Sequence, residues 1–145
     1  MLKLMYITNS PEVASIADGA GVDRIFIDLE QYGKEKRQKN WDSVKSKHSI
    51  SDIPKVKSAV KNAQIFVRTD PICDGFSDEL EGVLACEPDV VMLPYFKTVR
   101  EVETFIKAVD GRATTSLLLE TREAAEQIDD IISVGGIDEI HIGLN

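Results

Sequence analysis

The chain has 145 residues, enough for one domain with a hydrophobic core, and 43% of them are hydrophobic and 29% charged. Its net charge of -8 argues against nucleic acid or an anionic membrane surface as the main partner. The two cysteines argue against a disulfide or zinc site and favour a cytoplasmic protein, and we expect neither a membrane span nor a signal peptide.

Strand-like and helix-like patterns alternate along the chain. Ser10 followed by Pro11 is typical of a helix start, and Thr98 with Glu101 three residues later predicts a capping box. Apolar runs predict strands at residues 3–8, 23–30, 64–70, 89–96, 113–120 and 137–145. Helical patterns lie at residues 10–21, 49–63, 74–88, 98–111 and 121–136. The polar segment 31–49 is expected to form a loop or a lid.

The predicted strands are apolar on both faces, as parallel strands covered by helices must be. Two α/β architectures fit this alternation: a doubly wound open sheet, and part of a (β/α)₈ barrel of the TIM type. No linker divides the chain, so we predict a single domain over residues 1–145.

Side chains capable of chemistry stand where the predicted strands end. Asp28 and Glu30 close the second strand, Arg68 the third, Pro94 the fourth and Glu120 the fifth. In parallel α/β folds these ends all lie on one face, and that face carries the active site. We therefore expect these side chains to gather at one rim of the sheet.

Carboxylates from two strands that meet an arginine from a third favour a bound cation. Asp28 and Glu30 share a face because side chains alternate along a strand, and Glu120 would approach from another strand. Such carboxylates repel one another and hold their protons more tightly unless a divalent cation relieves them. Oxygen ligands favour a hard ion such as Mg²⁺, and no histidine–cysteine cluster in the sequence suggests zinc.

Four segments resemble the HpcH/HpaI aldolase and citrate lyase β-subunit family: "DRIFIDLE", "FVRTDP", "DVVMLPYFKTVREVETF" and "LLLETREAAEQIDDIISVGGIDEIHIGLN". The resemblance implies a TIM-type barrel, of which this chain would be an incomplete, N-terminal part of about six strands. It also implies Mg²⁺, Mn²⁺ or a related divalent cation, and a lyase or aldolase that makes or breaks carbon–carbon bonds. The implied substrate is a pyruvate-type 2-keto acid or an acyl-CoA, and we expect a homo-oligomer.

The same resemblance implies roles for two residues at the rim. Glu120 would be a metal ligand, and Arg68 would be catalytic, holding the substrate carboxylate and the enolate oxygen. From their places at the strand ends, we also expect Glu30 to be a catalytic residue, either beside the metal ligand or as the partner of Arg68, and Pro94 to contact the substrate. These roles suit enolate chemistry, because a metal polarises the carbonyl while a guanidinium neutralises the developing charge.

Two positions depart from the family pattern. The aldolase branch usually has a histidine base directly after the glutamate of the second strand, where this chain has Gln31, so the base is not identified. The family's second metal carboxylate would come directly after Asn145. A complete barrel needs at least about 200 residues, so we expect a truncated barrel that is inactive alone and has open sheet edges.

Simpler roles for the rim residues stay open. Glu120 could cap the helix that follows it. Arg68 could be an ordinary ion-pair partner of Asp70 or Glu30, and Asp28 could be structural, bonding loop amides.

The histidines and the whole chain also have structural alternatives. His48 is expected to be solvated in its polar loop, and His141 to be packed and hydrogen-bonded between Ile140 and Ile142. The chain could instead be a non-catalytic α/β binding or regulatory domain completed by oligomerisation, or a barrel enzyme of different chemistry that handles phosphate.

Overall fold

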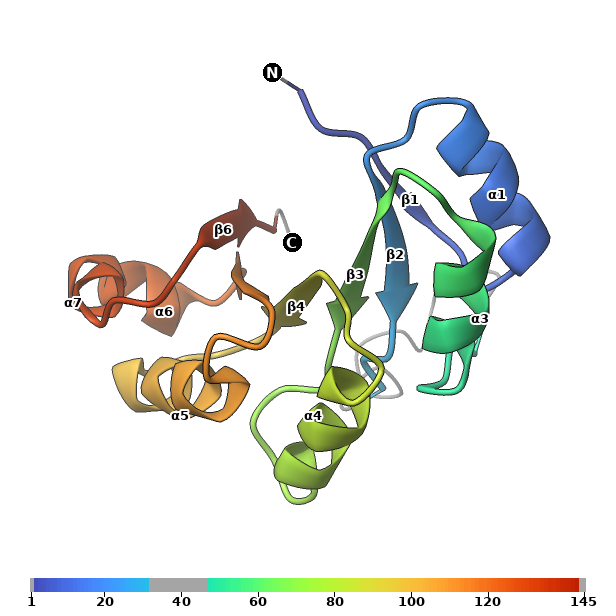
Figure 1. Cartoon of the computed structure of the whole chain (residues 1–145). Coiled ribbons are helices and arrows are strands. Elements are labelled where there is room, and N and C mark those ends of the chain that lie inside the picture. The colour runs from blue at the N-terminus through green and yellow to red at the C-terminus, as the bar shows by residue number, and fades with distance from the viewer. Residues whose placement is uncertain (1, 32–46, 144–145) are drawn as a thin grey trace, which may run out of the picture.

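The computed structural model describes residues 2–31 and 47–143, in which parallel strands alternate with helices (Figure 1). The strands are β1 (Met5–Ile7), β2 (Arg24–Asp28), β3 (Gln64–Arg68), β4 (Val90–Leu93), β5 (Thr114–Leu119) and β6 (Glu139–Ile142). The helices are α1 (Pro11–Gly19), α3 (Asp52–Ala59), α4 (Phe76–Leu84), α5 (Val99–Val109), α6 (Arg122–Glu126) and α7 (Ile128–Ser133). Most of the predicted loop 31–49 lies outside the described residues.

The strands form one sheet in the order β1-β2-β3-β4-β5-β6, and every neighbouring pair is parallel. This sequential order is that of a TIM-type barrel, and it rules out the doubly wound sheet, whose strand order reverses at a switch point. In Figure 1 the sheet bends into an arc with the helices along its outer side and β1 and β6 at its two ends. The described residues therefore form an incomplete α/β barrel, as the sequence predicted.

The main hydrophobic core lies between the sheet and the helices. Alternate strand residues such as Ile27, Val67 and Leu93 point to this side and are fully buried. Burial of one such aliphatic side chain contributes about 1.5–3 kcal/mol relative to its exposure. This layer holds the strands in register and so fixes the positions of their carboxyl ends.

The concave side of the arc carries a second, smaller apolar cluster. Phe66, Val90, Met92 and Leu118 are buried there. Phe26 packs edge-on against Phe66, with ring centroids 5.1 Å apart and an interplanar angle of 79°. Because both sides of the strands bury apolar residues, the strand sequences lack the polar–apolar alternation of a half-exposed sheet.

Two arginines flank this aromatic pair at opposite ends of the strands. Arg24, at the start of β2, lies 5.4 Å from the ring centroid of Phe66, and Arg68, at the end of β3, lies 5.6 Å from that of Phe26. Arg24 also donates hydrogen bonds of 2.7 and 2.5 Å to the two carboxylate oxygens of Glu139 in β6. This ion pair joins β2 to β6 across the concave side and supports the curvature of the sheet.

The helix starts that the sequence predicted are present. Ser10 accepts a hydrogen bond from the backbone N–H of Val13, and Pro11 occupies the first turn of α1. Thr98 and Glu101 form the reciprocal bonds of a capping box at the start of α5. None of the helices in the described part of the chain has both the length and the apolar character needed to cross a membrane.

The predicted helix 121–136 is instead two short helices, α6 and α7. The chain leaves helical geometry at Gln127, whose φ is -113° and ψ is 19°. The side-chain amide of Gln127 donates 3.0 Å hydrogen bonds to the carbonyl oxygens of Lys97 and Glu123. These bonds tie the break to the segment before α5. No proline or glycine stands at this point, so the sequence carries no ordinary signal for the interruption.

Candidate active site

Arg68 at the carboxyl end of β3 binds two carboxylates at the carboxyl end of β2. Its Nε and Nη2 atoms each donate a 2.9 Å hydrogen bond to one oxygen of Asp28. Its Nη1 atom lies 3.2 Å from Oε2 of Glu30, whose side chain is 4% exposed. The contact follows from strand register, because Asp28 and Arg68 are directly paired and Glu30 lies two residues farther along the same face.

The charges around Arg68 hold it firmly in the protonated form. Burial of the guanidinium works to lower its pKa, but the hydrogen bonds that it donates to Asp28 and the negative charges of Asp28, Glu30 and Glu120 raise the pKa above its ordinary value. Arg68 is 18% exposed in its side chain, so the residue is not wholly enclosed. The two carboxylates therefore fix the position of the guanidinium at the rim.

Glu120 faces the same place from β5. Its Oε1 atom accepts a 3.1 Å hydrogen bond from the backbone N–H of Tyr95, which follows β4 and has the uncommon positive φ of 50°. The charge of Glu120 is among those that raise the pKa of Arg68. The alternative role as a helix cap is wrong, because Thr121 caps α6 by accepting a hydrogen bond from the N–H of Ala124.

Gly143, directly after β6, leaves room beside Glu120. A Cβ atom built on Gly143 would lie 3.0 Å from the Cβ of Glu120 and 3.3 Å from Cδ1 of Leu118. Its backbone N–H donates a 3.0 Å hydrogen bond to the carbonyl of Leu119. Any larger residue at position 143 would press on the Glu120 side chain, so the glycine protects the position of that carboxylate.

Asp28 and His48 together order the end of β2. Besides binding Arg68, Asp28 accepts a 3.3 Å hydrogen bond through Oδ1 from the backbone N–H of Glu30. This bond agrees with the alternative prediction that Asp28 has a structural role and bonds loop amides. The backbone N–H of Asp28 donates a 2.9 Å bond to Nδ1 of His48. The prediction that His48 is solvated is wrong, because the residue is only 6% exposed. Its ring nitrogen accepts the N–H of Asp28 at a point where the backbone pairing of β1 with β2 has already ended.

His141 also differs from its prediction. It lies on the concave face of β6, paired in register with Leu118 of β5, and it is exposed rather than packed. β6 stands at the end of the sheet in the described part of the chain, and its residues Ile140 and Ile142 are exposed too. The prediction assumed a strand covered on both sides, which does not hold at this edge.

Asp70 links the ends of β2 and β3. The sequence offered Asp70 or Glu30 as an ordinary ion-pair partner of Arg68. The structure shows ion pairs of Arg68 with Glu30 and with Asp28. Asp70 instead accepts a 2.6 Å hydrogen bond from the backbone N–H of Gln31. The predicted rim residue Pro94 is buried at the end of β4.

We define the rim as Asp28, Glu30, Arg68, Pro94 and Glu120, which stand at the carboxyl ends of β2 to β5 as the sequence predicted. Its four ionisable members, Asp28, Glu30, Arg68 and Glu120, carry a formal charge of -2. An excess of carboxylates suits a hard cation.

The described residues supply only part of a metal site. Within residues 2–31 and 47–143, no three His, Cys, Asp or Glu side chains come together in a group that could hold a metal ion. Glu120 fits as a single oxygen ligand, since its Oε1 is oriented by Tyr95 and the glycine at position 143 keeps its flank clear.

Sequence reasoning missed the backbone and loop contacts of the rim. The backbone N–H of Tyr95, which orients Glu120, could not be predicted from the type of residue at position 95, because every residue except proline has a backbone N–H. Asp70 could have been found, since it stands two residues after Arg68 and one before a proline, where aspartate often bonds a neighbouring backbone amide.

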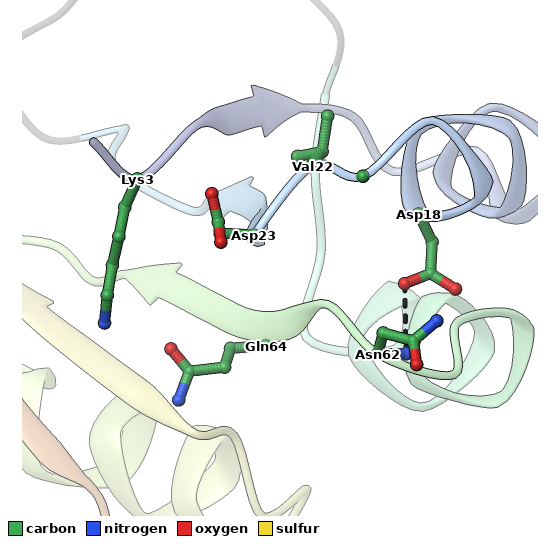
Figure 2. Close-up of a pocket in the computed structure, with 7 residues that line it drawn as sticks. Lys3, Asp18, Val22, Asp23, Asn62 and Gln64 are labelled. Atoms are coloured by element: carbon green, nitrogen blue, oxygen red, sulfur yellow. Dashed lines mark hydrogen bonds between the residues drawn. The ribbon is translucent and has the colours of Figure 1, made fainter. Parts of the chain in front are cut away.

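A pocket of about 410 Å³ lies at the other end of the strands (Figure 2). It is lined by Lys3, Asp18, Gly21, Val22, Asp23, Asn62 and Gln64. Figure 2 shows Asp18 pointing from α1 to the backbone of Asn62, whose N–H it accepts at 3.0 Å. Asp18 also accepts the N–H groups of Lys61 and Ala63, so its carboxylate serves the loop between α3 and β3. In barrel enzymes this amino-terminal face serves stability.

Comparison with known proteins agrees with the fold and names the family. A profile of the HpcH/HpaI aldolase/citrate lyase family matches residues 3–145. An HpcH/HpaI aldolase/citrate lyase family protein from Burkholderia cenocepacia has a similar structure, with a TM-score of 0.76 and 12% identity, covering 97% of this chain and 63% of that one. Citrate synthase SbnG is similar with a TM-score of 0.71 and 17% identity, covering 97% and 60%. No match was found among curated proteins.

The chain thus spans less than two thirds of the length of these two solved proteins. At identities this low, the structural likeness establishes the fold, and the family profile carries the assignment. Because that profile covers nearly the whole chain, this protein belongs to the HpcH/HpaI aldolase/citrate lyase family, a family of lyase-type enzymes.

Proposed function

We propose that this chain carries the substrate-holding part of a metal-dependent carbon–carbon lyase or aldolase that acts on a 2-keto acid or an acyl-CoA. The observation that carries the proposal is that Arg68 and Glu120 stand at the carboxyl ends of β3 and β5, on one rim of the parallel sheet. The charge of Glu120 is also one of the causes that raise the pKa of Arg68. The family assignment supports the lyase class. The specific substrate and the metal are part of the proposal.

Arg68 would hold the carboxylate of the substrate and neutralise the enolate oxygen as it develops. Cleavage of a carbon–carbon bond beside a carbonyl places negative charge on that oxygen, and one preorganised donor is worth about 3 kcal/mol in such a transition state. Asp28 fixes the plane of the guanidinium through two bonds, and Glu30 holds its Nη1 edge. These carboxylates therefore spare Arg68 from reorganising during the reaction.

Glu120 would hold the divalent cation, which when bound would polarise the substrate carbonyl as a Lewis acid. The Tyr95 N–H orients one oxygen of Glu120, and the glycine at position 143 leaves space at its flank. Pro94, directly before Tyr95, would form a rigid wall for the substrate. The expected homo-oligomer would complete the surroundings of the rim.

A binding experiment on this chain tests the proposal without requiring turnover. Thermal melts with Mg²⁺ and pyruvate together are expected to show a higher melting temperature than melts without them, because a ligand that binds only the folded state stabilises it. Glu120→Gln should abolish the shift. Glu123→Gln is the matched control, since Glu123 is an exposed carboxylate in the first turn of α6.

The outcomes separate the two readings of the chain. A shift that persists in Glu120→Gln would contradict the metal-ligand role. Melts indifferent to Mg²⁺, chelator and pyruvate would favour the non-catalytic binding or regulatory domain instead.

A further inference from the structure

A relay of hydrogen bonds runs from α4 to the rim. Both carboxylate oxygens of Glu79, in the first turn of α4, lie within hydrogen-bond distance of the backbone N of Asp70, at 3.3 and 3.2 Å. The carboxylate of Asp70 in turn accepts the N–H of Gln31 at 2.6 Å. Gln31 directly follows Glu30, and Asp70 stands two residues after Arg68. The relay therefore joins a helix to both strand ends that meet in the ion pair.

The relay continues the pairing of β2 and β3 beyond their ends. The N–H of Leu29 donates a 2.9 Å bond to the carbonyl of Arg68, in the manner of the parallel ladder. The Asp70 side chain then supplies the next acceptor, for Gln31, after the backbone ladder has stopped. The distance between Glu30 and Arg68 thus depends on where Asp70 is held.

We propose that Glu79 is a positioning residue of the rim, which fixes Asp70 and through it holds Glu30 against Arg68. The proposal rests on the proposed function in taking Glu30 and Arg68 as site residues. Glu79 itself acts at a distance from the substrate, from the helix behind the rim. Its protonation state would then adjust the geometry of the Arg68 ion pair.

The surroundings of Glu79 place the protonation of its carboxylate near neutral pH. Burial first, and the negative charge of Asp70 second, raise the pKa of Glu79 to about 7, although the Asp70 N–H opposes the shift. Cys73 in the same loop has its pKa raised, by burial and by the charges of Asp70, Glu79 and Asp74. The ionisable groups facing Glu79 are thus Asp70 and Cys73, with Asp78 its neighbour on α4. Below pH 7 one carboxylate of the pair is neutral, and above it the two repel.

Nuclear magnetic resonance of the unmodified chain tests the proposal directly. The backbone amide of Gln31 and the Nε–H of Arg68 are followed from acid to alkaline pH, without metal or substrate. Both signals are expected to shift with a common inflection near pH 7. Glu79→Gln keeps an acceptor oxygen for Asp70 but removes the titration, so the inflection should disappear. Asp78→Asn, which removes an exposed charge from the same turn, should retain it.

Persistence of the inflection in Glu79→Gln would overturn the proposal. Should that variant fold poorly, titration of the Glu79 carboxyl carbon in the unmodified chain decides the matter. An apparent pKa shared with the Gln31 amide and the Arg68 Nε–H supports the relay, and unrelated values overturn it. Because no ligand is added, a failure of metal or pyruvate binding would contradict the proposed function while leaving this result intact.

Discussion

The single positive charge of Arg68 pairs with two carboxylates, those of Asp28 and Glu30. Replacement of Arg68 would therefore leave two negative charges without this partner. Its partners Asp28 and Glu30 are 14% and 4% exposed in their side chains. Removal of one member of a buried ion pair costs about 3–5 kcal/mol, because the remaining charge stays desolvated and unpaired. The rim is therefore a place where substitutions affect stability as well as chemistry.

We predict that Arg68→Met lowers the free energy of unfolding by about 3 kcal/mol, measured by urea denaturation at neutral pH. Arg112→Met is the matched control, because Arg112 forms a similar two-bonded pair with Glu81 at the exposed surface. The control should lose clearly less stability than Arg68→Met, since water screens exposed pairs. Equal losses in the two variants would contradict the buried character of the Arg68 pair.

Glu79 gives a second prediction, in which stability depends on pH. Its folded pKa of about 7 lies above the ordinary 4.5, so its contribution is fully present below pH 4.5 and is lost as pH rises through 7. Glu79→Gln should therefore be more stable than the unmodified chain at pH 8, by about 1–3 kcal/mol for a half-buried group. Near pH 4 the two chains should differ little. An equal difference in urea denaturation at both values would refute the raised pKa.

At the residue scale, strand ends were predictable, whereas most backbone and loop contacts, apart from that of Asp70, were not. Arg68, Glu30 and Glu120 could be placed at one rim because parallel strands end on one face. The environments of His48 and His141 were wrongly predicted, since burial there depends on where neighbouring strands stop. A single sequence carries the order of the strands but not the length of each ladder.

At the scale of elements, the predicted caps at Ser10 and Thr98 are present. Thr98 and Glu101 form the capping box that their spacing predicted. The predicted helix 121–136 divided at Gln127, because the bond from its side chain to the Lys97 carbonyl comes from a distant part of the chain. Local pattern therefore located where helices begin, while tertiary contacts decided where one of them breaks.

We predict that Thr98→Ala lowers the free energy of unfolding by about 1 kcal/mol, the usual cost of losing an N-cap side chain. The Thr98 hydroxyl accepts a hydrogen bond from the N–H of Glu101, and the Glu101 carboxylate accepts one from the N–H of Thr98. Thr104→Ala is the control, because the Thr104 hydroxyl bonds to the Arg100 carbonyl within α5. A loss in the control as large as that in Thr98→Ala, by urea denaturation, would contradict the capping role.

At the scale of the whole molecule, the two ends of the sheet expose apolar surface. Ile7 of β1 is 53% exposed and Ile142 of β6 is 67% exposed. Strand edges with exposed apolar side chains tend to pair with other chains. The strand order and the incomplete barrel were predictable from the sequence, since they follow from the alternation of strands and helices and from the family resemblance.

We predict that the chain self-associates through these edges, so that its mass in sedimentation velocity rises with protein concentration. Ile142→Lys should shift the distribution towards the monomer, because a charge there opposes burial. Ile132→Lys, which alters an exposed residue of α7 instead, should leave association unchanged. A monomer at every concentration, or an equal effect of both variants, would contradict association through the edge.

The proposed function depends most on Arg68 and Glu120 serving one ligand. A double-mutant cycle tests this by calorimetric titration of oxalate, a planar mimic of the pyruvate enolate, in the presence of Mn²⁺. Arg68→Lys, Glu120→Gln and both together are compared with the unmodified chain. We predict that Arg68→Lys weakens oxalate binding strongly in the unmodified chain but little once Glu120 is replaced, giving a coupling energy of at least about 1 kcal/mol. Independent, additive losses would contradict a shared ligand.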